Sequence, residues 1–307
     1  MLGKLPLIAG FLVVSVLPMT GQEGTAAPAA RVPVATKVPV GTKVVYESIG
    51  GQDLSLYVIG PSGQGAGAKR PAMLFFHGGA WVGGPLNEFD RQAEYLAGRG
   101  VVCIQVEYRF AERGPEGTIR PSVQDAKSAM RWVRAHAGEL GIDPHRVGAS
   151  GGSAGGQLAA YLGMMTGEDN PGDDASIPFR PDLMVLFNPA IDLGPQGCCP
   201  GRAHGDYKAF SPLYHVHGGV PPTLILQGDA DKLVPPQMIQ GFVEDMKKAG
   251  NEISVVMYPG VGHGFFIFRD NFYLSLEQAD RFLAAHGWIS GSPDEVALHK
   301  LPPRPVP

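Results

Sequence analysis

Hydrophobic and polar residues along this chain form blocks of two different periods. Short apolar runs, typical of buried strands, occupy residues 72–76, 101–107, 147–149, 183–187, 223–226 and 253–257. Segments with helical spacing of apolar side chains occupy residues 89–98, 122–137, 153–165, 236–248 and 272–285. The alternation of strands and helices predicts an α/β fold, in which a mostly parallel central sheet carries helices on both faces.

Two more strand-like segments precede this series. Residues 44–48 and 54–59 flank a Gly-Gly-Gln turn, which predicts an N-terminal antiparallel hairpin. The glycine-rich residues 60–70 follow, but no helix continues them, so we reject a phosphate-binding loop there. Because the series contains no internal repeat, we expect one domain over residues 44–288.

The two ends of the chain differ in composition from this domain. Residues 1–26 begin with Lys4 and a proline-interrupted apolar run and continue with small residues, as in a signal peptide. One candidate cleavage point follows Ala26, and an uncleaved membrane anchor is the alternative. We expect residues 27–43 to be a linker and the proline-rich residues 289–307 to be a tail on the surface or disordered. The sequence thus predicts a secreted or periplasmic protein without stable membrane insertion after processing.

Composition adds limits on partners and on redox chemistry. The chain has 307 residues, 44% of them hydrophobic and 18% charged, and a net charge of −4 without any Lys- or Arg-rich run. This excludes an extended nucleic-acid surface. Of the three cysteines, Cys103 is expected in the core. Cys198 and Cys199 are adjacent, and both a strained vicinal disulfide and a free thiol stay open.

A candidate nucleophile lies where the run at residues 147–149 meets the next helix. Residues 151–155 read Gly-Gly-Ser-Ala-Gly and match the G-x-S-x-G pattern. Between a strand and a helix, this pattern predicts a sharp, strained turn that exposes the hydroxyl of Ser153. The small neighbours fit, because a strained turn leaves little room for side chains.

A serine nucleophile requires an acid and a histidine, in that order along a chain of this type. Of nine histidines, His263 lies after the last predicted strand and before the last helix. Asp231 is the favoured acid because it lies deeper in the turn after residues 223–226; Asp229 and Asp192 are the alternatives.

Histidine side chains can also bind metal ions. His215 and His217 form a pair, but no third ligand has convincing spacing, so we expect no metal site.

The stabilisation of an oxyanion requires converging backbone amides. One is the amide of Ala154, directly after the nucleophile, and others are expected in residues 77–81, which follow the strand at 72–76. In the same segment, Trp81 is expected either to wall an acyl pocket or to pack in the core, and both alternatives stay open.

Five segments in order resemble the α/β-hydrolase esterases and lipases with an HGG-type oxyanion loop, related to hormone-sensitive lipase and to bacterial feruloyl and acetylxylan esterases. These segments are residues 77–81, 106–109, 151–156, 228–235 and 262–265. The resemblance implies an α/β-hydrolase fold, with Ser153 as nucleophile, Asp231 as acid and His263 as base. It also implies oxyanion donors at Gly79, Ala80 and Ala154, and no cofactor.

The resemblance and the residues together predict a secreted serine carboxylester hydrolase that acts through an acyl-enzyme. Small-molecule esters with short acyl groups, or acetyl and feruloyl esters of plant polysaccharides, are the expected substrates. Ala80 stands where relatives of hormone-sensitive lipase usually have a third glycine, which favours the polysaccharide-esterase branch. The alternatives are an inactive binding protein of the same fold and a serine peptidase. Residues 166–181 and 191–221 are expected to set specificity.

Overall fold

The computed structural model describes residues 38–61, 69–111 and 117–300. The strands are β1 (Thr42–Ile49), β2 (Gln52–Ile59), β3 (Arg70–Phe76), β4 (Val102–Val106), β5 (Ile142–Gly152), β6 (Met184–Phe187), β7 (Thr223–Gly228) and β8 (Ile253–Tyr258). The helices are α1 (Asp90–Gly98), α2 (Arg120–Ala135), α3 (Ala137–Leu140), α4 (Ala154–Met164), α5 (Tyr207–Phe210), α6 (Pro236–Lys248), α7 (Arg269–Ala285) and α8 (Glu295–Lys300). Short 3₁₀ turns are η1 (Pro212–Tyr214) and η2 (Phe265–Ile267).

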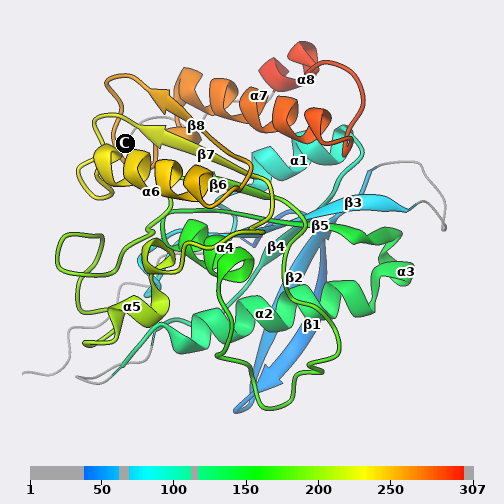
Figure 1. Cartoon of the computed structure of the whole chain (residues 1–307). Coiled ribbons are helices and arrows are strands. Elements are labelled where there is room, and N and C mark those ends of the chain that lie inside the picture. Colours follow the sequence, from blue (N-terminus) through cyan, green and yellow to red (C-terminus); the bar gives the residue numbers. More distant parts are fainter. Residues whose placement is uncertain (1–37, 62–68, 112–116, 301–307) are drawn as a thin grey trace, which may run out of the picture. The chain divides into compact units, whose positions relative to one another are not determined.

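The described strands form one eight-stranded sheet in the order β1-β2-β4-β3-β5-β6-β7-β8. The pairs β1–β2 and β2–β4 are antiparallel, and all pairs from β4–β3 to β7–β8 are parallel. In Figure 1, α1 and α7 lie above the sheet, and α2 and α4 lie below it. This architecture confirms the predicted α/β-hydrolase fold and its N-terminal antiparallel hairpin.

The core is divided by the sheet into two apolar layers. Along β3, Leu74 and Phe76 join the layer of α2, α4 and α6, whereas Met73 and Phe75 join the layer of α1, α7 and α8. Successive side chains of a strand point to opposite faces, so a strand covered on both faces is apolar throughout. This is why the central strands read as continuous apolar runs in the sequence.

Two elements begin three or more residues before their predicted starts. β5 begins at Ile142 rather than near residue 147, because Asp143, His145 and Arg146 interrupt the apolar pattern at a part of the strand that is only partly buried. α7 begins at Arg269, three residues before the predicted start at residue 272. Both differences arise because a backbone conformation can continue where the hydrophobic signal has stopped.

The packed part of the chain also extends past the predicted boundary at residue 288. Trp288, Ile289 and Leu298 are buried, and the amide of Asp294 donates to the hydroxyl of Tyr95 over 3.0 Å. The prediction of a surface or disordered tail from residue 289 is therefore wrong as far as α8. The sequence did not predict the short helix α8 because apolar residues in this segment are few and widely spaced, and because the prolines around it suggested an irregular chain.

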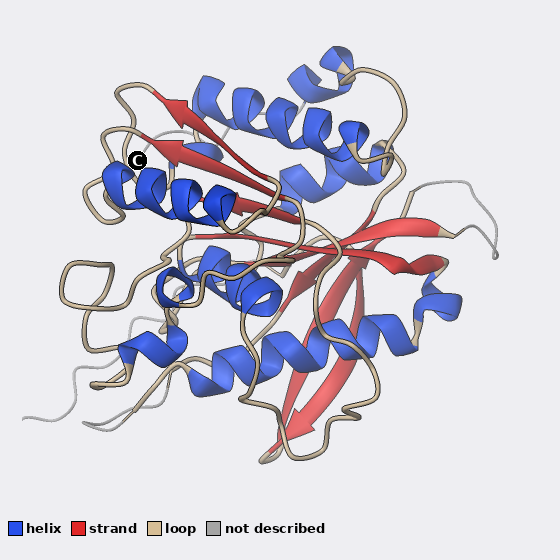
Figure 2. Cartoon of the chain, viewed as in Figure 1, coloured by secondary structure: helices blue, strands red, loops and turns tan. Residues whose placement is uncertain are grey.

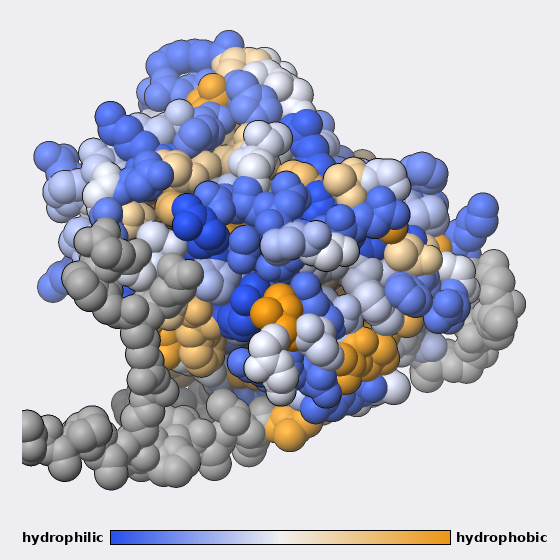
Figure 3. All heavy atoms as spheres, turned by 90° about the horizontal axis from the view of Figure 1, so that it is seen from below, coloured by the Kyte–Doolittle hydropathy of each residue, from blue (hydrophilic) through white to orange (hydrophobic). Residues whose placement is uncertain are grey.

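Other predictions about the ends fall outside the described residues, namely the signal peptide at 1–26, most of the linker at 27–43, and the tail at 301–307. Among the described residues, no helix combines the length and the apolar character that crossing a membrane requires. The face seen from below in Figure 3 is mostly hydrophilic, with small separate hydrophobic areas.

Gly155, in the first turn of α4, allows this helix to approach β3. A Cβ atom at this position would lie 1.9 Å from the carbonyl oxygen of Phe76. We expect Gly155→Ala to lower the free energy of unfolding by about 3 kcal/mol or more, because neither backbone can give way. Urea denaturation measures this change.

The matched control is Gly241→Ala in α6, where a Cβ atom would meet nothing within 4 Å. Since alanine is the better helix former, this variant should gain about 0.5–1 kcal/mol. Equal stability of the two variants would contradict the proposed packing.

Candidate active site

Ser153 lies between β5 and α4, in a backbone conformation that side chains rarely adopt. Its φ is 53° and its ψ is −113°. Hydrogen bonds fix this turn: the amide of Ser153 donates to the oxygen of Phe187 over 3.0 Å, and its own carbonyl accepts from Gln157 at 3.0 Å and Ala190 at 3.1 Å. A strained residue held by its surroundings is characteristic of a functional position. The predicted strand–turn–helix context of Ser153 is thus present.

The residues around this turn leave no space for larger side chains. A Cβ atom at Gly152 would lie 2.5 Å from Cζ of Phe266, and one at Gly151 would lie 2.6 Å from the oxygen of Phe76. The glycines of the pattern are therefore required by packing as well as by the turn. Figure 2 shows that loops gather on the side toward which the arrowheads of β7 and β8 point.

Asp231 lies in the loop after β7, and His263 lies in the loop after the neighbouring strand β8. The two side chains contact each other. Nδ1 of His263 is 2.8 Å from Oδ2 of Asp231, and the carboxylate is buried while the ring is partly exposed. The other oxygen, Oδ1, accepts from the amides of Leu233 at 2.8 Å and Val234 at 2.9 Å. An imidazole oriented in this way presents Nε2 as a proton acceptor.

The protonation of Asp231 is set by opposing effects. Burial alone would raise the pKa of Asp231, but the hydrogen bond from His263 and those from the Val234 and Leu233 amides lower it overall. The carboxylate is therefore charged at neutral pH and favours the Nδ1–H form of His263.

The two alternative acids have other partners. Oδ1 of Asp229 accepts from the amide of Gly260 at 2.6 Å, and Oδ1 of Asp192 accepts from the amide of Gly194 at 2.8 Å. Of the three candidates, Asp231 is the one whose carboxylate contacts His263 among the hydrogen bonds of the described residues.

Asn188 contacts His263 and was not found from the sequence. It follows Phe187, whose carbonyl accepts from Ser153, and it is fully buried. Its Nδ2 lies 3.4 Å from Nε2 of His263, and its Oδ1 accepts from the amide of Gly264 at 3.1 Å. The available signal was its position directly after β6, at the sheet edge where β5 and β7 also end.

The loop after β3 turns sharply beside the turn that holds Ser153. Gly79 has φ 122°, and the non-glycine residues Ala80 and Trp81 have φ values of 52° and 57°. A Cβ atom at Gly79 would lie 2.1 Å from the oxygen of Gly83. In the part of the chain that is described, the amides of Gly79, Ala80 and Ala154 have no hydrogen-bond acceptor. They are free to serve a ligand.

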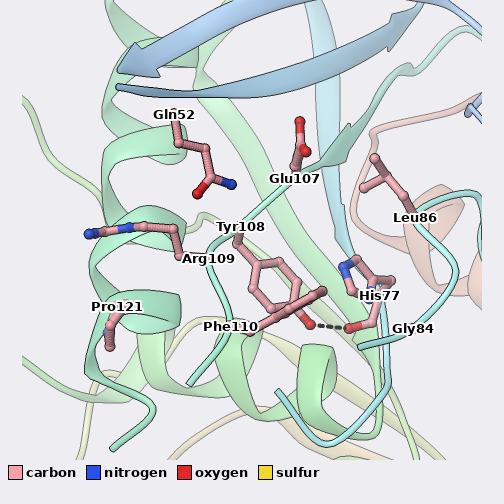
Figure 4. A pocket seen from close by; sticks show the side chains of 9 residues that line it. All are labelled: Gln52, His77, Gly84, Leu86, Glu107, Tyr108, Arg109, Phe110 and Pro121. Carbon is pink, nitrogen blue, oxygen red and sulfur yellow. Dashed lines mark hydrogen bonds between the residues drawn. The ribbon is translucent and has the colours of Figure 1, made fainter. Parts of the chain in front are cut away.

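Side chains behind this loop hold its conformation. Tyr108 donates its hydroxyl to the oxygen of His77 at 2.7 Å (Figure 4). The amide of Gly78 donates to Oε2 of Glu88 at 2.7 Å, and Nδ1 of His77 is 2.7 Å from the oxygen of Gly78. Burial lowers the pKa of His77 to about 4, so this ring is neutral and its Nδ1–H donates. Glu88 had no sequence signal, whereas Tyr108 lies in the segment 106–109 that belongs to the resemblance.

Trp81 is fully buried. Its Nε1 donates to Oε1 of Gln157 at 3.1 Å, and Gln157 in turn donates to the oxygen of Phe210 at 2.8 Å. An indole without exposed surface has no direct access to a substrate. Of the two alternatives for Trp81, the structure therefore favours packing over a wall of an acyl pocket, and this contact ties the loop after β3 to α4.

A pocket of about 620 Å³ is lined in part by His77 and Tyr108 (Figure 4). Its described lining also includes Gln52, Glu107, Phe110 and Leu86 but not Ser153. The His77 ring stacks on Tyr108 with their centroids 4.5 Å apart. The pocket thus adjoins the loop after β3 without containing Ser153.

The histidine pair considered for a metal is used in the fold. Nε2 of His215 contacts the oxygen of Lys208 at 2.7 Å, and Nε2 of His217 contacts the oxygen of Met164 at 2.8 Å. Within the described ranges, no group of three His, Cys, Asp or Glu side chains is placed to hold a metal ion.

Comparison with known proteins identifies relatives of this arrangement. Residues 73–200 match a family described as having the alpha/beta hydrolase fold. The apo structure of esterase 2 from Thermogutta terrifontis is 39% identical, with a TM-score of 0.78, over 85% of this chain and 100% of that one. Other structures of that esterase are described as propionate-bound, as butyrate-bound and as phosphorylated by paraoxon.

Curated relatives are more distant and most are longer. The probable carboxylic ester hydrolase LipM of Mycobacterium tuberculosis is 28% identical over 64% of this chain and 49% of its own length. The carboxylesterase NlhH of the same organism is 27% identical over 70% of this chain and 72% of its own length. The chain spans about half the length of the first three of these relatives.

Proposed function

Because the chain belongs to the α/β-hydrolase family, in its esterase and lipase branch, we propose that it is a serine carboxylesterase. Ser153 is the nucleophile of this proposal, His263 the base and Asp231 the acid. The observation that carries it is the 2.8 Å contact between His263 and Asp231, together with the strained turn at Ser153. Esterase 2, at 39% identity over its whole length, supports the same activity.

In the proposed reaction, Nε2 of His263 takes the hydroxyl proton as Oγ of Ser153 attacks the ester carbonyl. The negative charge that develops on the carbonyl oxygen is held by the amides of Gly79, Ala80 and Ala154. Each well-placed donor lowers the barrier by about 3 kcal/mol. The imidazolium then returns its proton to the leaving alcohol, and an acyl-enzyme remains. Water, activated by the same histidine, releases the acid.

Asn188 contacts Nε2 of His263 when no substrate is bound. Its amide group can donate to the neutral ring, so it keeps Nε2 unprotonated before Ser153 engages it. Asn188 is a positioning residue in this proposal, since it acts through the histidine.

The proposed substrates are small esters with short acyl groups. Esterase 2 is described with propionate and with butyrate bound, which supports this class. Acetyl or feruloyl esters of polysaccharides are the second class, and the resemblance to polysaccharide esterases favours them. Export through residues 1–26 is part of the proposal and rests on the signal-like sequence.

Initial rates on a panel of esters test the activity and its substrates together. We expect p-nitrophenyl acetate, propionate and butyrate to be hydrolysed faster than p-nitrophenyl decanoate, with acetylated xylan and methyl ferulate as further substrates. A chromogenic dipeptide amide serves as the comparison. Peptide cleavage without ester cleavage would favour a peptidase, and no turnover of any compound would favour a binding protein.

A further inference from the structure

Two cysteines adjacent in the sequence are in contact in the loop between β6 and α5. Their Sγ atoms lie 2.6 Å apart, and both side chains are thiols in this structure. Cys198 is buried, whereas Cys199 is partly exposed. A reagent from solvent therefore reaches Cys199 first, and Cys198 lies directly behind it.

The loop backbone fixes both residues. The amide of Cys198 donates to the oxygen of Asp192 at 2.8 Å, and the amide of Arg202 donates to the oxygen of Cys199 at 3.2 Å. Gly197 allows this turn, since a Cβ atom there would lie 2.1 Å from the oxygen of Asp192. Cys199 itself has φ 59°, a conformation rare for a residue with a side chain. The contact between the thiols is thus built into the turn.

The charges that act on this pair include those of the proposed triad. The hydrogen bond from Cys198 is the largest effect on the Cys199 thiol and lowers its pKa. Burial opposes it by a smaller amount, and the charges of Arg202 and His263 lower the pKa further, to about 7. For Cys198, the contact with Cys199, burial and the charge of Asp231 raise the pKa. Cys199 is therefore the nucleophilic member near neutral pH.

We propose that Cys198 and Cys199 form a thiol–disulfide exchange site that closes a reversible bond in the loop between β6 and α5. The oxidant is a small-molecule disulfide such as oxidised glutathione. The Cys199 thiolate attacks one of its sulfurs, which forms a mixed disulfide and releases one thiolate. Cys198 then loses its proton to solvent and attacks the Cys199 sulfur, which releases the second thiolate. Two protein thiols are oxidised, and one disulfide is reduced to two thiols.

The geometry of adjacent residues makes this bond easy to reverse. Consecutive Cα atoms are about 3.8 Å apart, closer than the roughly 4.4–6.8 Å usual in disulfides. Strained disulfides are more easily reduced than structural ones, and reversible sites are drawn from this class. A site of this kind responds to the thiol–disulfide balance of its surroundings.

Mass spectrometry tests the chemistry independently of any activity. After equilibration of the native full-length chain with oxidised glutathione, we expect a loss of about 2 Da, two hydrogen atoms. Cys198 and Cys199 should become resistant to iodoacetamide together, and dithiothreitol should restore both. Cys198→Ser should instead retain glutathione on Cys199. The fully buried Cys103 is the internal control and should stay unmodified in the native protein.

Persistence of both alkylatable thiols in excess oxidised glutathione would overturn the exchange site. A protein without ester hydrolysis would contradict the proposed function and leave the mass result standing.

Discussion

Replacing Ser153 by alanine is expected to lower kcat for p-nitrophenyl butyrate by about 10⁵-fold or more, because the remaining groups cannot form an acyl-enzyme. The side chain is small and lies in a turn fixed by backbone hydrogen bonds to Phe187 and Ala190. The free energy of unfolding should therefore change little. A loss of activity without a loss of stability separates a chemical role from a structural one.

The matched control for this variant is Ser150→Ala. Ser150 lies on β5, three residues before Ser153, is buried and donates its hydroxyl to the oxygen of Val185 at 2.7 Å. Its replacement should cost about 1 kcal/mol of stability and leave ester hydrolysis close to that of wild type. Full activity of Ser153→Ala, or equal inactivation of both variants, would refute the nucleophile assignment.

Much of the fold was readable because buried parallel strands leave an unambiguous pattern. The apolar runs located every strand of the parallel sheet, and β5 was shortened where polar residues such as Asp143 and His145 begin it. The short α5 and η1 were missed, since four or three residues are too few to establish a helical period. The last helix packs against α7 with a single buried side chain, Leu298, and this weak apolar signal was concealed by the proline-rich composition.

The candidate site was readable where chemistry restricts the residue type. Ser153, Asp231 and His263 each follow a strand in the order that the fold requires, and their turns carry glycines. Asn188 and Glu88 gave no such signal, because an amide or carboxylate that supports a loop is defined only by what it contacts. The contact between Cys198 and Cys199 likewise depends on how the loop between β6 and α5 turns.

The choice among the acids leads to the second large expected effect. Asp231→Asn should lower kcat for the same ester by about 10⁴-fold, as for the loss of the acid in other serine triads. Oδ1 at this position accepts from the Leu233 and Val234 amides, so an asparagine is expected to keep its carbonyl oxygen there and to turn its NH₂ toward His263. The ring then has to present an acceptor at Nδ1, and Nε2 carries the proton that it would otherwise accept from Ser153.

Asp229→Asn is the matched control, because its carboxylate accepts from the amide of Gly260 and has no contact with His263 among the described hydrogen bonds. This variant should keep a kcat close to that of wild type, with unfolding curves recorded for both proteins. The reverse result, with Asp229→Asn inactive and Asp231→Asn active, would show that Asp229 is the acid and that the assignment to Asp231 is wrong. Equal and small effects would instead direct attention to Asp192, whose carboxylate caps the turn at Gly194. A selective loss in Asp231→Asn would identify the buried carboxylate as the group that sets the tautomer of His263.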